Sequence, residues 1–254
     1  MKRTLIALAV AVSAVVSGSA MAWTPNGSGS NVELGGTLTP ETKVTPWSVK
    51  TGAPVINLNG QIQKGLKEAR VVSANAIPVL GIRTTNKTPF NGQSGISPVI
   101  SYDGVVDLDK FEDSVAPLTL EVKNAKDVKI GTLKTKIFAQ ARTSMKGAYN
   151  GQFWNYSGQL GQGFWGGLPK SMDKVSRVSR VNDLMPEVAQ NYLAQDVIDR
   201  GVSYSTFSGH DSLHSAYYFS AIEPNTAIDI SLDVAAAAEA IAWKASLPVT
   251  VSYQ

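Results

Sequence analysis

Residues 118–133 read LTLEVK-NAKD-VKIGTL, two segments in which apolar and polar residues alternate around a polar turn. Alternation with a period of two places the apolar side chains of each segment on one face and the polar side chains on the other. The four residues between the segments, Asn124 to Asp127, include types that favour turns. The stretch therefore predicts a β-hairpin with one face on a core and one face in water.

Short runs of the same kind recur on both sides of this hairpin, separated by glycine, proline, asparagine and aspartate. Strands at such spacing are typical of a β-sandwich. We therefore predict an all-β chain, with candidate strands at 68–73, 77–83, 98–102, 118–123, 128–140, 217–222, 227–233 and 247–253.

Three segments depart from this β pattern. Apolar residues at helical spacing between Asp183 and Arg200, with Asp183 as N-cap and Gly201 as a stop, predict an inserted amphipathic helix. The alanine-rich run Val234–Trp243 fits either a second short helix or a bulged continuation of the strand before it. Residues 147–167 contain seven glycines and six aromatic residues, and so many glycines argue against regular structure there.

The first 22 residues have the order of a secretory signal peptide. A basic pair at positions 2 and 3 precedes an apolar run at 5–16, and the triplet Ala-Met-Ala follows at 20–22. The apolar run is shorter than the roughly 20 residues that a membrane-spanning helix needs. We therefore predict a signal peptide at 1–22 and export of the remainder.

Composition argues against nucleic-acid binding and against stabilisation by disulfides. The chain has 23 Lys and Arg against 20 Asp and Glu, and two of the basic residues belong to the predicted signal peptide. The mature chain is thus almost neutral and has no basic block, so we expect no nucleic-acid partner. It contains no cysteine, so its stability must come from core burial, from ligands or from assembly with partners.

Both ends of the mature chain read as strands with one apolar face. At the C-terminus, Leu247, Val249, Val251 and Tyr253 alternate with Pro248, Thr250, Ser252 and Gln254. Near the N-terminus, after a Gly/Ser-rich lead-in, the residues sharing one face are Val32, Leu34, Gly36 and Leu38. A mid-strand glycine often marks the approach of another backbone, so this segment either inserts into another domain as an extended strand or is an edge strand of its own domain.

These two ends resemble those of the Fae-type subunits of chaperone–usher fimbriae, the thin flexible fibrillae of enterotoxigenic enterobacteria. The resembling segments are the opening VELGGTL at 32–38 and the close WKASLPVTVSY at 243–253. The residues around 122–133, the segment PVLG at 78–81 and the predicted signal peptide are also similar to that family. The absence of cysteine fits this branch of the fimbrial subunits.

The resemblance implies an incomplete immunoglobulin-like sandwich that lacks its last strand and carries inserted loops and a short helix. It divides the chain into a signal peptide (1–22), an N-terminal donor-strand extension (23–40) and a pilin domain (41–254). It implies that Val32, Leu34, Gly36 and Leu38 enter the groove of a neighbouring subunit. Leu247, Val249, Val251 and Tyr253 would line this subunit's own groove, which a periplasmic chaperone covers until the outer-membrane usher assembles the fibre. Pro248 is a departure, because proline cannot donate a hydrogen bond within a sheet ladder.

Conventional active-site motifs are missing from the sequence. There is no G-x-S-x-G, P-loop, H-E-x-x-H or cysteine pair, and we expect neither catalysis nor a cofactor or metal. The two histidines, His210 and His214, lie close together with Asp211 between them. A metal site or a hydrolytic triad could use them, but we interpret this segment as a solvated turn between strands.

Two further interpretations stay open. The rings of Trp154, Tyr156 and Trp165 could stack on sugars of a host glycoconjugate, or they could pack the inserted loop onto the sandwich. The leading hypothesis is a structural fimbrial subunit of the minor type that supports adhesion. The alternatives are the receptor-binding major adhesin, with a glycan site near 147–167, and an unrelated secreted β-rich binding or hydrolytic protein.

Overall fold

The computed structural model describes residue 25, residues 34–37 and residues 44–254. Val44–Gln254 forms one unit, here called the body, which is distinct from the unit Met1–Lys43. The predicted signal peptide at 1–22 lies outside the described residues. Within the described ranges, no helix has both the length and the apolar character required to cross a membrane.

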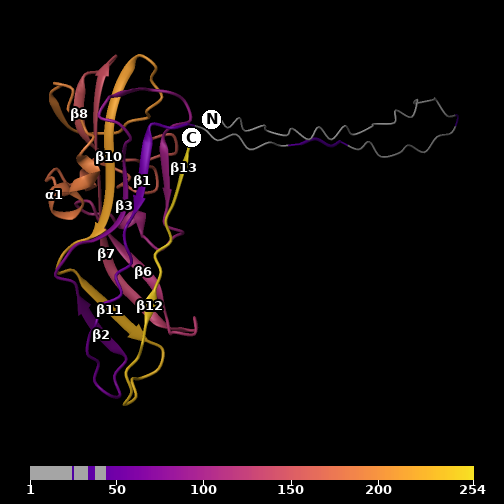
Figure 1. Cartoon of the computed structure of the whole chain (residues 1–254), viewed down its shortest axis with the longest axis vertical. Helices are drawn as coiled ribbons and strands as arrows, with labels where there is room; N and C mark the ends of the chain where they lie inside the picture. The colour runs from indigo at the N-terminus through magenta and orange to yellow at the C-terminus, as the bar shows by residue number, and fades with distance from the viewer. Residues whose placement is uncertain (1–24, 26–33, 38–43) are drawn as a thin grey trace, which may run out of the picture. The chain divides into compact units, whose positions relative to one another are not determined.

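A strand of 19 residues, β7 (Lys129–Gly147), is central to the body. Its first half pairs with β6 (Val115–Lys123) on one side and with β11 (Ala227–Leu232) on the other. Its second half pairs with β8 (Gly151–Asn155) and with β10 (Ser212–Ile222). All four pairings are antiparallel, so β7 joins both ends of the body (Figure 1).

The predicted hairpin is confirmed as β6 and β7. Leu118, Leu120 and Val122 are buried, whereas the alternate positions Thr119 and Glu121 are exposed. In the turn, the Asn124 side-chain oxygen accepts hydrogen bonds from the backbone N–H groups of Lys126 (2.9 Å) and Val128 (3.1 Å). Such a bond from a side chain to the backbone two residues ahead is the reason that asparagine favours turns.

The other strands complete two sheets. β3 joins β10, β1 joins β3, and β2 joins β11, while β5 and β13 form a small sheet of their own. The predicted all-β sandwich is therefore confirmed. The remaining elements are β1 (Trp47–Thr51), β2 (Glu68–Val72), β3 (Ile77–Thr84), β4 (Phe90–Asn91), β5 (Pro98–Ser101), η1 (Leu108–Lys110), η2 (Met172–Lys174), α1 (Val181–Leu184), η3 (Pro186–Ala189), β9 (Asp199–Ser203), β12 (Lys244–Ala245) and β13 (Thr250–Tyr253).

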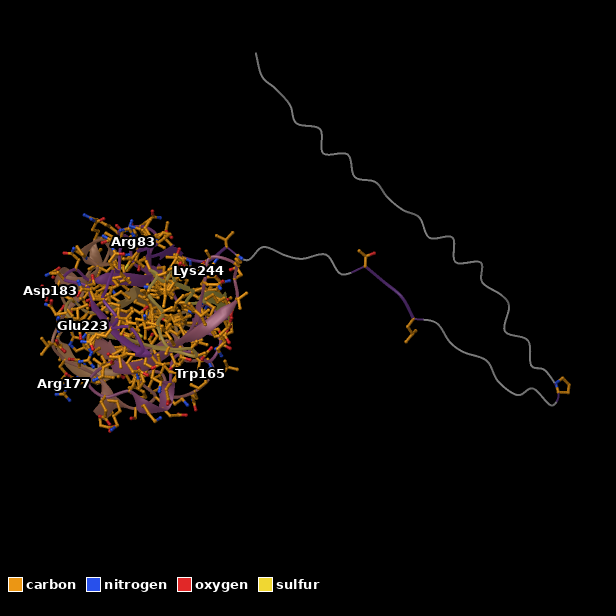
Figure 2. The ribbon with its side chains drawn as sticks, turned by 90° about the horizontal axis from the view of Figure 1, so that it is seen from below. Arg83, Trp165, Arg177, Asp183, Glu223 and Lys244 are labelled. Carbon is orange, nitrogen blue, oxygen red and sulfur yellow. The ribbon has the colours of Figure 1, made fainter. Side chains whose placement is uncertain are left out.

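The body has two hydrophobic cores, one on each face of the larger sheet. On β10, Tyr218 belongs to the main core, which also receives Ile100 of β5, whereas its neighbours Tyr217 and Phe219 belong to the second core. Residues 175–192 cover this second core. In Figure 2, Arg177 and Asp183 of the covering segment lie on the side of the body away from Lys244. A strand with apolar contacts on both faces is expected where a sheet is covered on both sides.

The long inserted helix predicted between Asp183 and Arg200 is wrong. The helix α1 ends at Leu184, and a single turn of 3-10 helix, η3, follows from Pro186. Proline has no N–H and disfavours a helical conformation at the preceding residue, and Met185 has φ −159°. Residues from Asp199 onward form the strand β9 instead.

Three other expectations need correction. The glycine-rich stretch 147–167 does contain regular structure, because β8 lies within it. The run Val234–Trp243 is neither a helix nor a strand. Its residue Ala236 forms backbone hydrogen bonds with Gly65 and Leu66 of another loop. The C-terminal strand begins at Thr250 rather than Leu247, because Pro248 cannot donate to a ladder.

Candidate functional site

The C-terminal strand β13 pairs on one side only in the part of the chain that is described. It is antiparallel to β5, and the pairing continues at Gln254, which exchanges two backbone hydrogen bonds of 3.0 and 3.1 Å with Ser97. Val251 and Tyr253 are half-buried against the main core, whereas Thr250 and Ser252 are exposed. The alternation predicted from the sequence is thus present, and the other edge of β13 has no ladder partner among the described strands.

Leu247 and Val249 precede this ladder. Both are half-buried and pack against the same core as Val251 and Tyr253. The four residues predicted to line a groove therefore all contact the main core while remaining partly accessible.

The first strand of the body, β1, also has one unpaired edge. It is antiparallel to β3 and has no second partner within the described ladders. Its first residue, Trp47, donates from Nε1 to the carbonyl oxygen of Ile96 at 2.6 Å. Because Ser97 is bonded to Gln254, the start of β1 and the end of β13 lie at the same end of the body (Figure 1).

The predicted donor segment is only partly described. Leu34 is 93% exposed, and a Cβ added at Gly35 or Gly36 would meet no atom within 4 Å. Val32 and Leu38 lie outside the described residues. The described residues of this segment therefore make no packing contact that would satisfy their apolar face.

The three rings predicted to contact sugars are folded into the body. Trp154 on β8 is buried, and Trp165 is half-buried with its carbonyl oxygen accepting a 2.7 Å hydrogen bond from the N–H of Ile100. Tyr156 is half-buried against Tyr204, with ring centroids 5.6 Å apart. These contacts are those expected if the rings pack the inserted loop.

Trp154 is held by a buried arginine. The Arg142 guanidinium lies 4.3 Å from the centre of the Trp154 ring, and its Nη2 forms a 2.5 Å ion pair with Oδ2 of Asp199. A cation over an aromatic face is stabilised by the ring quadrupole. Arg142 thereby links β7 to β8 and β9.

Hydroxyl groups join the two sheets through the main core. Tyr102 Oη lies 2.7 Å from Tyr218 Oη and 2.7 Å from Ser220 Oγ. The Tyr218 hydroxyl also lies within 3.1 Å of the carbonyl oxygen of Gly167, to which it can donate. Burial is the main cause that raises the pKa of Tyr102 to about 12, so this bridge stays protonated and hydrogen-bonded at neutral pH.

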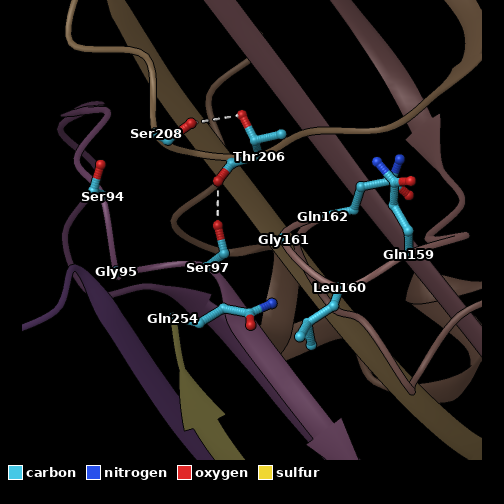
Figure 3. A pocket seen from close by; sticks show the side chains of 10 residues that line it. All are labelled: Ser94, Gly95, Ser97, Gln159, Leu160, Gly161, Gln162, Thr206, Ser208 and Gln254. Atoms are coloured by element: carbon cyan, nitrogen blue, oxygen red, sulfur yellow. Dashed lines mark hydrogen bonds between the residues drawn. The ribbon is translucent and has the colours of Figure 1, made fainter.

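A pocket of about 420 Å³ opens beside the C-terminus (Figure 3). Four segments that are far apart in the sequence line it: 94–97, 159–162, 206–208 and Gln254. Its lining carries hydroxyl and amide groups and no charged side chain. The Gln254 Nε2 atom is buried and has no hydrogen-bond partner among the described residues, so it could donate to a ligand.

The prediction of a solvated turn is wrong for His214. His210 is exposed, but His214 belongs to β10 and is buried, with ring centroids 5.6 Å from Phe90 and 5.5 Å from Phe207. Neither ring nitrogen makes a well-formed hydrogen bond within the described structure. Burial is the main cause that lowers the pKa of His214 from 6.5 to about 4, and the nearby Gly209 backbone acts in the opposite direction.

Acid should destabilise the body through His214. Between pH 6.5 and about 4, the unfolded chain binds a proton at this residue and the folded chain does not. The stabilisation is therefore complete above pH 6.5 and is lost as the pH falls toward 4, by about 3 kcal/mol in total. Urea unfolding across this pH range should show the loss for the wild type.

The two histidines provide the control for this pH effect. A His214→Phe variant should have a flatter profile, whereas His210→Gln should keep the wild-type slope. A slope that survives in His214→Phe would assign the effect to other groups.

The sequence gives little sign of the pocket or the hydroxyl bridge, because both combine residues from distant segments. In the described part of the chain, no group of three or more His, Cys, Asp or Glu residues is placed to hold a metal ion.

Known proteins similar to this chain are fimbrial proteins. A family model described as "Fimbrial, major and minor subunit" matches residues 1–254. K88 fimbrial protein AD of Escherichia coli is 33% identical over 192 residues, which cover 68% of this chain and 66% of that protein. K88 fimbrial protein AC of the same organism is 30% identical over 191 residues, which cover 68% and 67%. The F41 fimbrial protein of E. coli is 35% identical over 147 residues, which cover 54% and 52%.

The matched region thus spans about two thirds of the K88 proteins AD and AC and about half of the F41 protein. The matches confirm the resemblance to Fae-type subunits and the predicted location in a surface fimbrium. The chain belongs to the family of major and minor subunits of K88-type fimbriae.

Proposed function

We propose that this chain is a structural subunit of the minor type, which joins neighbouring subunits by donating its N-terminal extension and accepting another. It has no catalytic role in this proposal. Residues 23–40 would form the donor extension, with Val32, Leu34, Gly36 and Leu38 facing the groove of the next subunit. The groove would lie along β13, lined by Leu247, Val249, Val251 and Tyr253.

One combination of observations supports this proposal above all. The edge of β13 has no ladder partner in the described structure, and its side chains are only half-buried, while Leu34 stands 93% exposed on a segment with the same alternation. Unpaired edges and exposed apolar residues promote aggregation, and adding a strand from another chain removes both. In this proposal a periplasmic chaperone covers the edge first and the outer-membrane usher directs the exchange.

A charge placed on the apolar face of the extension tests the donor role. In the mature chain, Leu34→Asp should abolish multimer formation, because a buried leucine contributes about 1.5–3 kcal/mol and a buried carboxylate adds a penalty. Multimers can be followed by size-exclusion chromatography and by electron microscopy of fibres.

Thr37→Asp is the matched control, since position 37 lies on the opposite face of an extended strand. It introduces the same charge and should leave multimers intact. Equal multimer formation by Leu34→Asp and the wild type would refute the donor role.

A second candidate function is that of the receptor-binding major adhesin. The pocket beside the C-terminus favours it, because residues 159–162 belong to the stretch predicted to hold a glycan site and neutral hydroxyl and amide groups suit a sugar. Trp154, Tyr156 and Trp165 would then support the site from within the body. The host glycoconjugate would be bound by the same chain that forms the fibre.

A further inference from the structure

The two ends of the body are formed by different parts of the chain. The end that contains the start of β1 and the end of β13, here called the terminal pole, is defined by the bonds of Trp47 to Ile96 and of Ser97 to Gln254. The N-terminal extension joins the body at this pole, at Val44, which is 89% exposed.

The opposite end is formed by two loops that meet around residues 63–67 and 233–236. The N–H of Gly65 donates to the carbonyl oxygen of Ala236, and the N–H of Ala236 donates to that of Leu66, both at 2.8 Å. Near this end β7 begins and Gly131 pairs with Leu232, whereas at its other end Gly147 pairs with Ser212 near the terminal pole (Figure 1).

These two tied loops expose apolar side chains. Val234 is 77% exposed and Leu66 is 49% exposed. Backbone bonds at Leu232 and Ala236 bring these two residues together, and the pair is here called the pole patch. Apolar residues gathered on an exposed surface are typical of a contact with another protein.

The direction in which the fibre grows determines which surface of a neighbouring copy contacts the pole patch. A linear fibre needs head-to-tail contacts, in which each copy uses two different surfaces. Each extension leaves its own body at the terminal pole. Consider a copy that accepts the extension of the next copy. If the body of the next copy lay at the terminal pole of the accepting copy, it would compete for space with the extension of the accepting copy. The opposite end, where the pole patch lies, has no such conflict.

We propose that the pole patch of each copy binds the terminal pole of the next copy, a second molecule of this chain, around its exposed Val44. The inference rests on the proposed donor-strand function and adds a second contact to each joint. A donor that is tethered to its body then gains affinity from both contacts, beyond that of the extension alone.

A single joint can be isolated with two mature full-length chains. The acceptor carries Leu34→Asp, so that it cannot donate, and the donor carries Val251→Asp, so that it cannot accept. Binding to the acceptor is measured by fluorescence anisotropy with either the labelled donor chain or a labelled synthetic peptide of residues 31–40. The peptide has no body and cannot contact the pole patch.

Adding Val234→Asp to the acceptor should weaken binding of the donor chain at least tenfold and leave peptide binding unchanged. Val178→Asp is the matched control, because Val178 is also an exposed valine but lies beside the middle of β7, where its carbonyl accepts a 3.0 Å bond from Gln140. It should change neither affinity.

Two results would overturn the inference while the donor-strand function stands: unchanged donor-chain binding to the Val234→Asp acceptor, or an equal loss of peptide binding. Failure of the peptide to bind the parent acceptor would instead refute the donor-strand function, and the inference with it.

Discussion

Replacing Leu118 with alanine should lower the free energy of unfolding of the mature chain by about 3 kcal/mol. Leu118 is fully buried on β6 within the main core, and its truncation removes apolar contacts and leaves a cavity. Urea unfolding followed by tryptophan fluorescence measures the change. The effect is large because β6 packs along the first half of β7, the strand that joins both ends of the body.

The neighbouring position supplies the control for this prediction. Thr119 lies on the exposed face of β6, so Thr119→Ala should change stability by no more than about 0.5 kcal/mol. Comparable losses at the two positions would contradict the assignment of the two faces of the hairpin.

Replacing Arg142 with alanine should loosen the segment that covers the second core, at a cost of about 2 kcal/mol. The guanidinium is almost fully buried between Trp154 and Asp199, and its removal leaves Trp154 without its covering group. The cost is below that of breaking a fully buried ion pair, because the Asp199 side chain is 53% exposed. Limited trypsin digestion should show faster cleavage after Arg177 and Arg180.

Arg200→Ala is a suitable comparison for Arg142→Ala. Arg200 also lies over an aromatic ring, 5.0 Å from the centre of Tyr149, but both residues are exposed. Its loss should leave the tryptic pattern in residues 175–192 unchanged. Similar digestion of the two variants would show that Arg142 does not hold this segment.

Alternation of side chains made much of the fold predictable from the sequence. The hairpin of β6 and β7, the strand β11 and the two faces of the C-terminal segment all follow from it. Prediction failed where one residue overrides a pattern. Pro186 ends a helix that the apolar spacing alone would extend, and Pro248 shortens the final strand by removing a donor.

Other elements were missed because their stability depends on tertiary contacts. The strand β8 lies in a glycine-rich stretch with no alternation, and it forms because it pairs with β7 and β9. His214 follows the polar residues 208–212 closely in the sequence, yet its place on β10 buries it beside Phe90 and Phe207. Local composition carries no information about such contacts.

Only part of the candidate site could be predicted from the sequence. The apolar face of Leu247, Val249, Val251 and Tyr253 could be predicted, since it depends on local alternation. The pocket beside the C-terminus could not be predicted, because it combines Gln254 with three loops that are distant in sequence. The pole patch depends on backbone bonds between residues 65–66 and 236, which no local pattern indicates.

The hydroxyl bridge of Tyr102, Tyr218 and Ser220 joins the two sheets in a chain that has no cysteine. Folding of this domain therefore needs no oxidant and no thiol–disulfide exchange, and reductants have no bond in it to break. The folded state of this subunit can thus form in an oxidising or a reducing medium alike.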